Sequence, residues 1–180
     1  ATSGITIQGN TLTMAGGGTA IYLPAASSAV VRGNPITGAT VGLDVKGGLI
    51  ANNFVQASLY ALSLVNPTSA TVVFNTLVAT GTNPALSLSS GTAGALTLVN
   101  NVLACPAGGV PFSNSAASTV VFAASDYNDF YTTGPTVASL GGTSYASLAA
   151  WRTATGLDAH SVSANPGLLS ATDLHSSAPA

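Results

Sequence analysis

The clearest pattern along the chain is a short arrangement of apolar and polar positions that returns six times. Each copy has an apolar residue, two variable residues, an Asn, one variable residue and another apolar residue, as around Asn10, except that the sixth copy has Ser in place of the Asn. The copies occupy residues 7–12, 31–36, 50–55, 72–77, 98–103 and 122–127, with pivots at Asn10, Asn34, Asn53, Asn75, Asn101 and Ser125. Consecutive pivots lie 19 to 26 residues apart, and self-similarity on that scale indicates a solenoid.

A second pattern follows each pivot after 8 to 10 residues. It has a small residue and then an apolar, a variable and an apolar residue. The copies are residues 20–23, 42–45, 61–64, 85–88 and 109–112, with Tyr22, Asp44, Ser63, Ser87 and Pro111 at the variable position. Alternation with a period of two predicts a strand with one buried face, so these variable residues are expected to point outward.

Clusters of Gly, Pro, Asn and Ser separate the two patterns, as in residues 45–48 and 80–84, and such clusters mark turns. The short strands keep both patterns in step if the chain coils and equivalent strands of successive coils pair in parallel. We therefore predict an all-β, single-stranded parallel β-helix of about six coils. The expected core columns are Ile7, Val31, Ile50, Val72, Leu98 and Phe122 on one side of the pivot, and Leu12, Ile36, Val55, Leu77, Leu103 and Tyr127 on the other.

The pivot Asn lies between two inward apolar residues where the chain must bend. Asn tolerates the left-handed backbone conformation better than other residues with a side chain, and it can hydrogen-bond to the local backbone. Stacked Asn side chains can also bond along the axis. We therefore interpret the pivot as a corner that fixes the register of each coil.

The repeat is expected to end at Ser125 and to be followed by a cap. Residues 144–155 read as a helix with Thr143 or Ser144 as its N-cap, Leu148 and Trp151 on one face and Gly156 as its stop. Solenoids need such a cap because the last coil exposes an apolar face. We predict one domain, with coils at residues 1–134 and the cap, including an irregular tail packed on the solenoid, at 135–180. The first coil is expected to present an open edge to a preceding domain or to another copy.

Charge is scarce: 47% of the 180 residues are hydrophobic and 4% are charged, with three basic and five acidic residues and a net charge of −2. Binding to a nucleic-acid backbone needs several Lys or Arg on one face, so that class of function is excluded. No apolar run is long enough to span a bilayer, so no membrane span is expected. Cys105 is the only cysteine and is expected to be a small buried hydrophobe.

Few residues offer candidate chemistry. Asp126 and Asp129 could form a carboxylate pair for glycoside hydrolysis, but a turn-capping role fits their spacing better. Asp44 and Lys46 share one strand, where we expect a solvated pair. We therefore predict no catalytic residue among these four.

The histidines give no further site. Asp158, His160 and Ser161 are too close in sequence for a catalytic triad, so structural hydrogen bonds are expected there. His160 and His175 with the scattered Asp residues lack the spacing of a metal site. No metal and no cofactor are predicted.

The C-terminal stretch resembles a known superfamily. Its motifs are Asp126-Tyr127-Asn128, the segment 147–156, Asp158-Ala159-His160-Ser161, Asn165-Pro166 and residues 173–179. These motifs are similar to the end of the right-handed parallel β-helix proteins of the pectate-lyase-like superfamily, which bacteria secrete or display on their surface. The resemblance implies a right-handed coil and export. It implies no single activity, because the superfamily includes lyases, hydrolases, adhesins, tail spikes and structural surface proteins.

Two functional hypotheses follow. The first is a non-catalytic extracellular structural module of a bacterial surface protein, adhesin or filament, whose copies can stack end to end. The second is a β-helix protein that binds or degrades polysaccharide, as a lyase or glycoside hydrolase does. Tyr22, Tyr60, Tyr127 and Tyr131 would then form a sugar platform. A scatter of these tyrosines over several faces would count against the second hypothesis.

Overall fold

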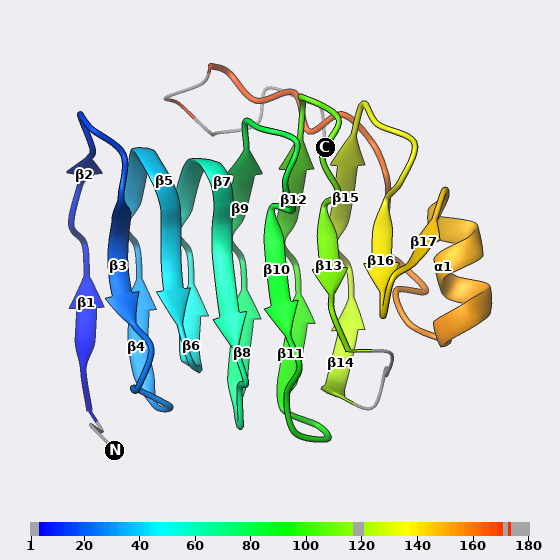
Figure 1. Cartoon of the computed structure of the whole chain (residues 1–180), viewed down its shortest axis with the longest axis horizontal. Helices are drawn as coiled ribbons and strands as arrows, with labels where there is room; N and C mark the ends of the chain where they lie inside the picture. The colour runs from blue at the N-terminus through cyan, green and yellow to red at the C-terminus, as the bar shows by residue number, and fades with distance from the viewer. Residues whose placement is uncertain (1–3, 117–120, 171–172, 174–180) are drawn as a thin grey trace.

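Short runs of β-branched and aliphatic residues, interrupted by turn residues, form the strands of a β-solenoid of about five turns. The computed structural model describes residues 4–116, 121–170 and 173. Figure 1 shows the strands lying across the long axis like rungs, from β1 at one end to β17 and α1 at the other. The predicted all-β solenoid with a short C-terminal helix is therefore confirmed. Six pivots delimit five intervals, which accounts for about five turns instead of the six expected.

One side of the solenoid is a parallel sheet with the described order β1-β4-β6-β8-β11-β14. Its strands are β1 (Thr6–Gln8), β4 (Ala29–Arg32), β6 (Gly48–Ala51), β8 (Ala70–Val73), β11 (Leu96–Val99) and β14 (Phe122–Asp126). The pairing keeps each inward residue over its equivalent in the next coil, as in Val31 on Ile50 and Ile50 on Val72. The first core column is thus built as predicted from Ile7 to Leu98, but Phe122, its predicted last member, pairs with Leu96 instead.

The other two sides belong to a second sheet that bends around the core. Its strands are β2 (Leu12–Thr13), β3 (Thr19–Leu23), β5 (Pro35–Val45), β7 (Phe54–Val65), β9 (Thr76–Ala79), β10 (Leu86–Ser89), β12 (Val102–Cys105), β13 (Phe112–Asn114), β15 (Asp129–Thr132), β16 (Ala138–Leu140) and β17 (Thr143–Tyr145). The long strands β5 and β7 cover both sides, with irregular register where they bend. In later coils the same path is divided into pairs such as β9 and β10.

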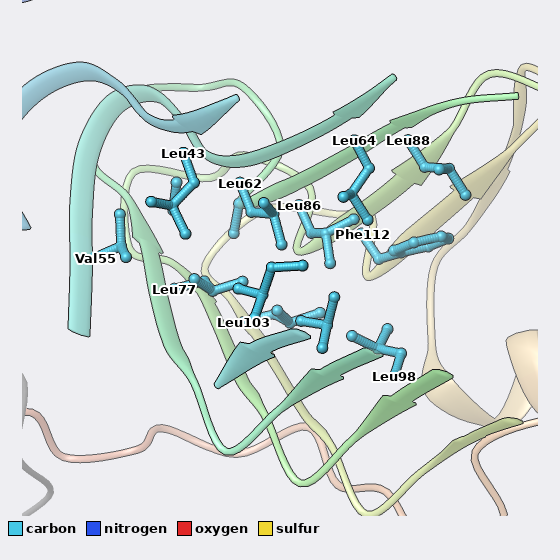
Figure 2. Packing of buried hydrophobic residues seen from close by; sticks show 14 of the residues in the cluster. Leu43, Val55, Leu62, Leu64, Leu77, Leu86, Leu88, Leu98, Leu103 and Phe112 are labelled. Atoms are coloured by element: carbon cyan, nitrogen blue, oxygen red, sulfur yellow. The ribbon is translucent and has the colours of Figure 1, made fainter. Parts of the chain in front are cut away.

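Aliphatic side chains fill the space between the sheets in columns that run along the axis. Figure 2 shows apolar side chains pointing inward from different coils, including Leu43, Leu62, Leu86 and the aromatic Phe112 from one side of the solenoid. These four residues follow one another in register and have no exposed surface. Burial of this kind stabilises by roughly 1.5–3 kcal/mol per large side chain, so the columns are the main source of stability.

The position of the sixth pivot was predicted wrongly. β14 contains an irregularity opposite Leu96 and Thr97, and beyond it Leu98 pairs with Ser125. The Asn that follows Asn101 at the same corner of the next coil is therefore Asn128. Phe130 instead of Tyr127 lies over Leu103 in the core. The repeat extends past Ser125, since Ser125 occupies the inward apolar position of the sixth copy.

The fifth copy of the second pattern was also misplaced, by two residues. Leu86 pairs with Phe112 and Ser87 pairs with Ser113, so Ser113 takes the place that we assigned to Pro111. Ser113 in turn pairs with Ser139 of β16, and this pairing is parallel. The parallel stack thus continues past residue 134, where we expected the coils to end.

The helix α1 (Leu148–Thr155) begins four residues later than predicted. Residues 143–145 form β17 instead and pair antiparallel with β16. Ser147 is the N-cap, and its side chain accepts a hydrogen bond from the Ala150 N–H at 3.2 Å. Gly156 ends the helix in the left-handed conformation, with φ of 72°, as expected.

Trp151 joins this helix to the core of the last coil. It is fully buried, and its ring lies 5.9 Å from that of Phe112, 6.5 Å from that of Phe122 and 5.3 Å from that of Tyr145. The contacts are tilted or edge-on, which is the favourable arrangement of aromatic pairs. The helix therefore covers the apolar end of the solenoid.

Candidate functional site

A ladder of Asn side chains runs along one corner of the solenoid. Each ladder Asn donates both its backbone N–H and an Nδ2–H to Oδ1 of the Asn in the next coil. For Asn53 and Asn75 the two distances are 3.0 and 2.9 Å. The Nδ2 group also donates to a backbone carbonyl of the preceding coil, as from Asn53 to Val31 at 2.9 Å. The same pattern links Asn10, Asn34, Asn53, Asn75, Asn101 and Asn128 in order.

Asp158 and Ser161 take the place of the next Asn at the C-terminal end of this ladder. The Asn128 backbone N–H donates to Ser161 Oγ at 2.8 Å, and Asn128 Nδ2 donates to Asp158 Oδ1 at 3.1 Å. Asp158 is buried and also accepts hydrogen bonds from the hydroxyls of Ser125 and Ser161 and from Trp151 Nε1. The segment that resembled a family motif therefore ends the ladder and ties it to the cap helix.

The residue just before each ladder Asn has a positive φ. This column consists of Gly9, Gly33, Asn52, Phe74, Asn100 and Tyr127, with φ between 52° and 66°. The prediction that the pivot Asn itself takes the left-handed conformation was wrong, because none of Asn10, Asn34, Asn53, Asn75 and Asn101 is among the residues with positive φ. The corner instead places the left-handed residue outside and the ladder Asn inside.

Two members of this column are unusual for their conformation. Gly and Asn accept positive φ readily, whereas bulky residues with positive φ are uncommon. Phe74 and Tyr127 both have φ of 56°, and their exposed fractions are 59% and 57%. Side chains this exposed gain little from packing, so the conformation of these two residues has no compensating contact in the core.

The two aromatic residues line an open hollow of about 420 Å³ beside the ladder. It is lined by Phe74, Asn100, Asn101, Val102, Tyr127, Asn128, Asp129, His160 and Val162. The rings of Tyr127 and His160 stack with centroids 4.9 Å apart and planes 7° apart. His160 Nδ1 lies 2.7 Å from Asp126 Oδ2, and the His160 backbone N–H donates to Asp126 Oδ1 at 2.7 Å. The hollow and the residues that line it are the candidate site, which we call the aromatic corner.

Asp126 and Asp129 bond to different parts of the tail. Asp126 holds His160, whereas Asp129 Oδ1 accepts the Ala164 N–H at 3.0 Å. Burial tends to raise the pKa of Asp126, but the hydrogen bonds from His160 and the Tyr127 N–H outweigh it and lower that pKa. Burial raises the pKa of Asp129 to about 6, and the bond from Ala164 offsets this only in part. Both carboxylates thus fix the backbone of a segment more than thirty residues away, and Asp126 also accepts the neighbouring Tyr127 N–H. This long-range role differs from the turn capping that we expected.

The other candidate residues do not gather into a site. Asp44 and Lys46 do not form an ion pair within 4 Å. In the described part of the chain, the one contact of this kind joins His160 and Asp126. One oxygen of Asp44 is buried without a hydrogen-bond partner. Within residues 4–116, 121–170 and 173 no group of three His, Cys or acidic side chains is placed to hold a metal, and His175 lies outside the described residues.

The four tyrosines do not form the expected platform. Tyr22 is 63% exposed on the side of the solenoid where it pairs with Asp44, whereas Tyr127 lies at the ladder corner. Tyr131 is on β15, on another side, and Tyr60 is half-buried in β7. They are scattered over several faces, which counts against a platform made of these four residues.

Another hollow, of about 380 Å³, lies between the tail and residues on or next to β7, β9, β12 and β15. It is lined by Gln56, Val78, Thr80, Ala104, Pro106, Tyr131, Asn165, Pro166, Leu168 and Ser170. Val78 and Ala104 are buried, with Leu168 packed against them. The contact fixes the tail on the solenoid.

Cys105 is buried, as its apolar setting predicted. Burial raises the pKa of its thiol to about 12, although bonds to the backbone of Ala85 and Ala79 oppose the shift. A thiol with such a pKa carries almost no thiolate at neutral pH and is a poor nucleophile.

Comparison with known proteins adds no assignment: no family model, no curated protein and no solved structure matches the chain. Among the described residues no helix has the length and apolarity to cross a membrane. The parallel β-helix fold therefore rests on the structure itself. Phe74 was not predicted as a site residue from the sequence. Its signal there is an aromatic residue directly before a pivot, where other copies have Gly or Asn.

Proposed function

We propose that the chain is a non-catalytic structural module of a bacterial extracellular protein, such as an adhesin or a filament. The observation that supports this most is the unbroken Asn ladder from Asn10 to Asn128, which ends on Asp158 at the cap. Every rung is held by hydrogen bonds in addition to core contacts, as a rigid spacer requires. The low charge and the C-terminal resemblance to secreted β-helix proteins support the extracellular setting.

The module is proposed to extend by stacking through β1, the outermost strand of its sheet among those described. The Ile5 carbonyl accepts the Val30 N–H, and the Gly9 N–H donates to the Arg32 carbonyl. Since these groups alternate along a strand, the Thr6 N–H faces the outer side of β1. A preceding coil or a second copy of the chain can pair there.

Light scattering over a range of concentrations tests this stacking. The mass of the unmodified chain should rise with concentration, whereas Thr6→Pro, which removes the outward N–H, should remain monomeric. Thr6→Val keeps the N–H and is the matched control. A monomeric mass for the unmodified chain at every concentration would reject stacking between copies.

A second candidate function is polysaccharide binding, and the aromatic corner is the observation that favours it. Phe74 and Tyr127 are exposed beside Asn100 in one hollow, so apolar and hydrogen-bonding surface lie together. The catalytic version, a lyase or a glycoside hydrolase, is tested by incubating the chain with neutral and acidic glycans. Release of reducing ends or unsaturated products would establish degradation, and their absence with retained binding would leave a binding module.

A further inference from the structure

The aromatic corner combines two unfavourable features at the same residues. Phe74 and Tyr127 have a positive φ, and more than half of each residue is exposed to solvent. Strained backbone and exposed aromatic surface persist at functional sites, where a ligand supplies the compensating contact. Asn52 and Asn100 show that the same corner can be made without an aromatic residue.

The two aromatic residues are spaced regularly along the solenoid. The Phe74 N–H donates to the Val99 carbonyl and the Asn100 N–H donates to the Asp126 carbonyl, so residues 74, 100 and 127 occupy successive rungs. Two rungs separate Phe74 from Tyr127 by roughly 10 Å, with the exposed Asn100 between them. This separation is comparable to the length of a disaccharide.

Tyr127 is held in place before any ligand arrives. His160 stacks on one face of its ring at 4.9 Å. The imidazole is held in turn by Asp126, whose carboxylate also accepts the His160 backbone N–H. A ring fixed in this way loses little freedom on binding, which favours affinity.

The ionisable groups at the corner restrict the ligand class. Asp129 and His160 line the hollow, and Asp126 adjoins it, whereas no Lys or Arg is among the lining residues. Anionic glycans and nucleic acids therefore find no Lys or Arg to bind, and the His160 ring is already paired with Asp126. An uncharged sugar can place a C–H face on an aromatic ring while its hydroxyls bond to the Asn100 amide and the Asp129 carboxylate.

We propose that Phe74, Asn100 and Tyr127 form a binding site for a neutral polysaccharide chain that lies along the ladder corner. This inference deepens the polysaccharide-binding candidate by naming its residues and its ligand class. It is independent of stacking through β1, which lies at the other end of its sheet from β14.

Electrophoresis through gels that contain a soluble polysaccharide tests the site. The probes are hydroxyethylcellulose, xyloglucan and galactomannan as neutral polymers and polygalacturonate as an acidic one. The unmodified chain should be retarded by at least one neutral polymer and not by polygalacturonate. Phe74→Asn and Tyr127→Asn should bind about tenfold more weakly, because each loses one aromatic contact.

The Asn variants also separate binding from folding, because Asn is the residue that this column already uses at positive φ. Their melting temperatures should equal or exceed that of the unmodified chain. Tyr22→Ser, which removes an exposed aromatic residue on another side, is the matched control and should bind normally. Normal binding by Phe74→Asn and Tyr127→Asn would overturn the site but leave polysaccharide binding in place, whereas no retardation of the unmodified chain would overturn both.

Discussion

Asn75 shows how a polar residue stabilises the interior of the solenoid. It is 2% exposed, accepts hydrogen bonds from the backbone and side chain of Asn53 and donates to Asn101 and to the carbonyls of Ile50 and Val73. An apolar residue at this position would leave several buried groups without partners, and each such group costs about 1–3 kcal/mol. The ladder is therefore favourable only as a complete set.

Asn75→Ala should lower the free energy of unfolding by at least about 3 kcal/mol, because the Asn53 donors lose their acceptor. Asn10→Ala is the matched control, since Asn10 is exposed at the start of the ladder and should lose less than about 1 kcal/mol. Urea unfolding followed by circular dichroism measures both. Equal losses for the two variants would mean that burial of the ladder does not matter.

Asp129 should make stability depend on pH between about 4 and 6. Its pKa in the folded chain is about 6, above the ordinary value of 3.8, because the carboxyl is partly buried. The folded state thus keeps a proton that the unfolded state releases, so stability is full below about pH 4 and falls as the pH rises to about 6. Above that range no further loss comes from this group.

Asp129→Asn removes this loss and keeps an oxygen for the Ala164 N–H. At pH 7 the variant should be more stable than the unmodified chain by about 1 kcal/mol, less than for a fully buried group because solvent screens the carboxylate. At pH 3.5 the two should have nearly the same stability. Thermal unfolding at both pH values measures this, and a parallel pH dependence in the two proteins would refute the assignment.

At the scale of elements, α1 is held to the last coil by one residue with two roles. Trp151 packs on Phe112 and Phe122 and also donates from Nε1 to Asp158 Oδ2 at 2.8 Å. Asp158 is the acceptor on which the Asn ladder ends. The cap and the ladder therefore share one buried carboxylate.

Replacement of Trp151 should separate these two roles. Trp151→Ala should cost about 3–5 kcal/mol, because it leaves a cavity at the end of the core. Trp151→Phe keeps most of the packing and should lose about 1–3 kcal/mol for the missing donor to a buried carboxylate. Chemical denaturation of both variants measures the losses. No loss for Trp151→Phe would mean that the hydrogen bond contributes nothing, and equal losses for the two variants would mean that the packing contributes nothing.

Most elements could be predicted from the sequence, and the exceptions have physical causes. The spacing of the pivots from Asn10 to Asn101 predicted the coils correctly, because apolar residues flank each of these pivots. The sixth copy was misread because the inward position there is Ser125, which is compatible with the core only through its bonds to the distant Asp158. The start of α1 was misplaced because β17 forms through pairing with β16, which local pattern does not reveal.

The candidate site was less predictable than the fold. The repeat indicated a corner at each pivot, but which residue takes the positive φ depends on how the backbone bends there. Phe74 and Tyr127 belong to one column only once the true register of β14 is known, since the misplaced pivot put Tyr127 in the core. The stack of Tyr127 on His160 depends on a contact between segments more than thirty residues apart.

At the scale of the whole molecule, the solenoid is an axial array in which each coil contacts its neighbours. Its central feature is that one row of Asn side chains fixes the register of all the described coils, from Asn10 to the cap. The core columns alone tolerate many aliphatic combinations, whereas the ladder needs an amide at each rung. The ladder is therefore what specifies a single register.

Hydrogen exchange of the Asn side-chain amides, followed by NMR, tests this feature most directly. The Nδ2 protons of Asn34, Asn53, Asn75, Asn101 and Asn128 should exchange slowly, since each is buried and donates to the next rung or to the backbone. Those of the exposed Asn52 and Asn100 provide the internal control and should exchange rapidly. Rapid exchange at all seven residues would contradict the ladder and with it the proposed register of the solenoid.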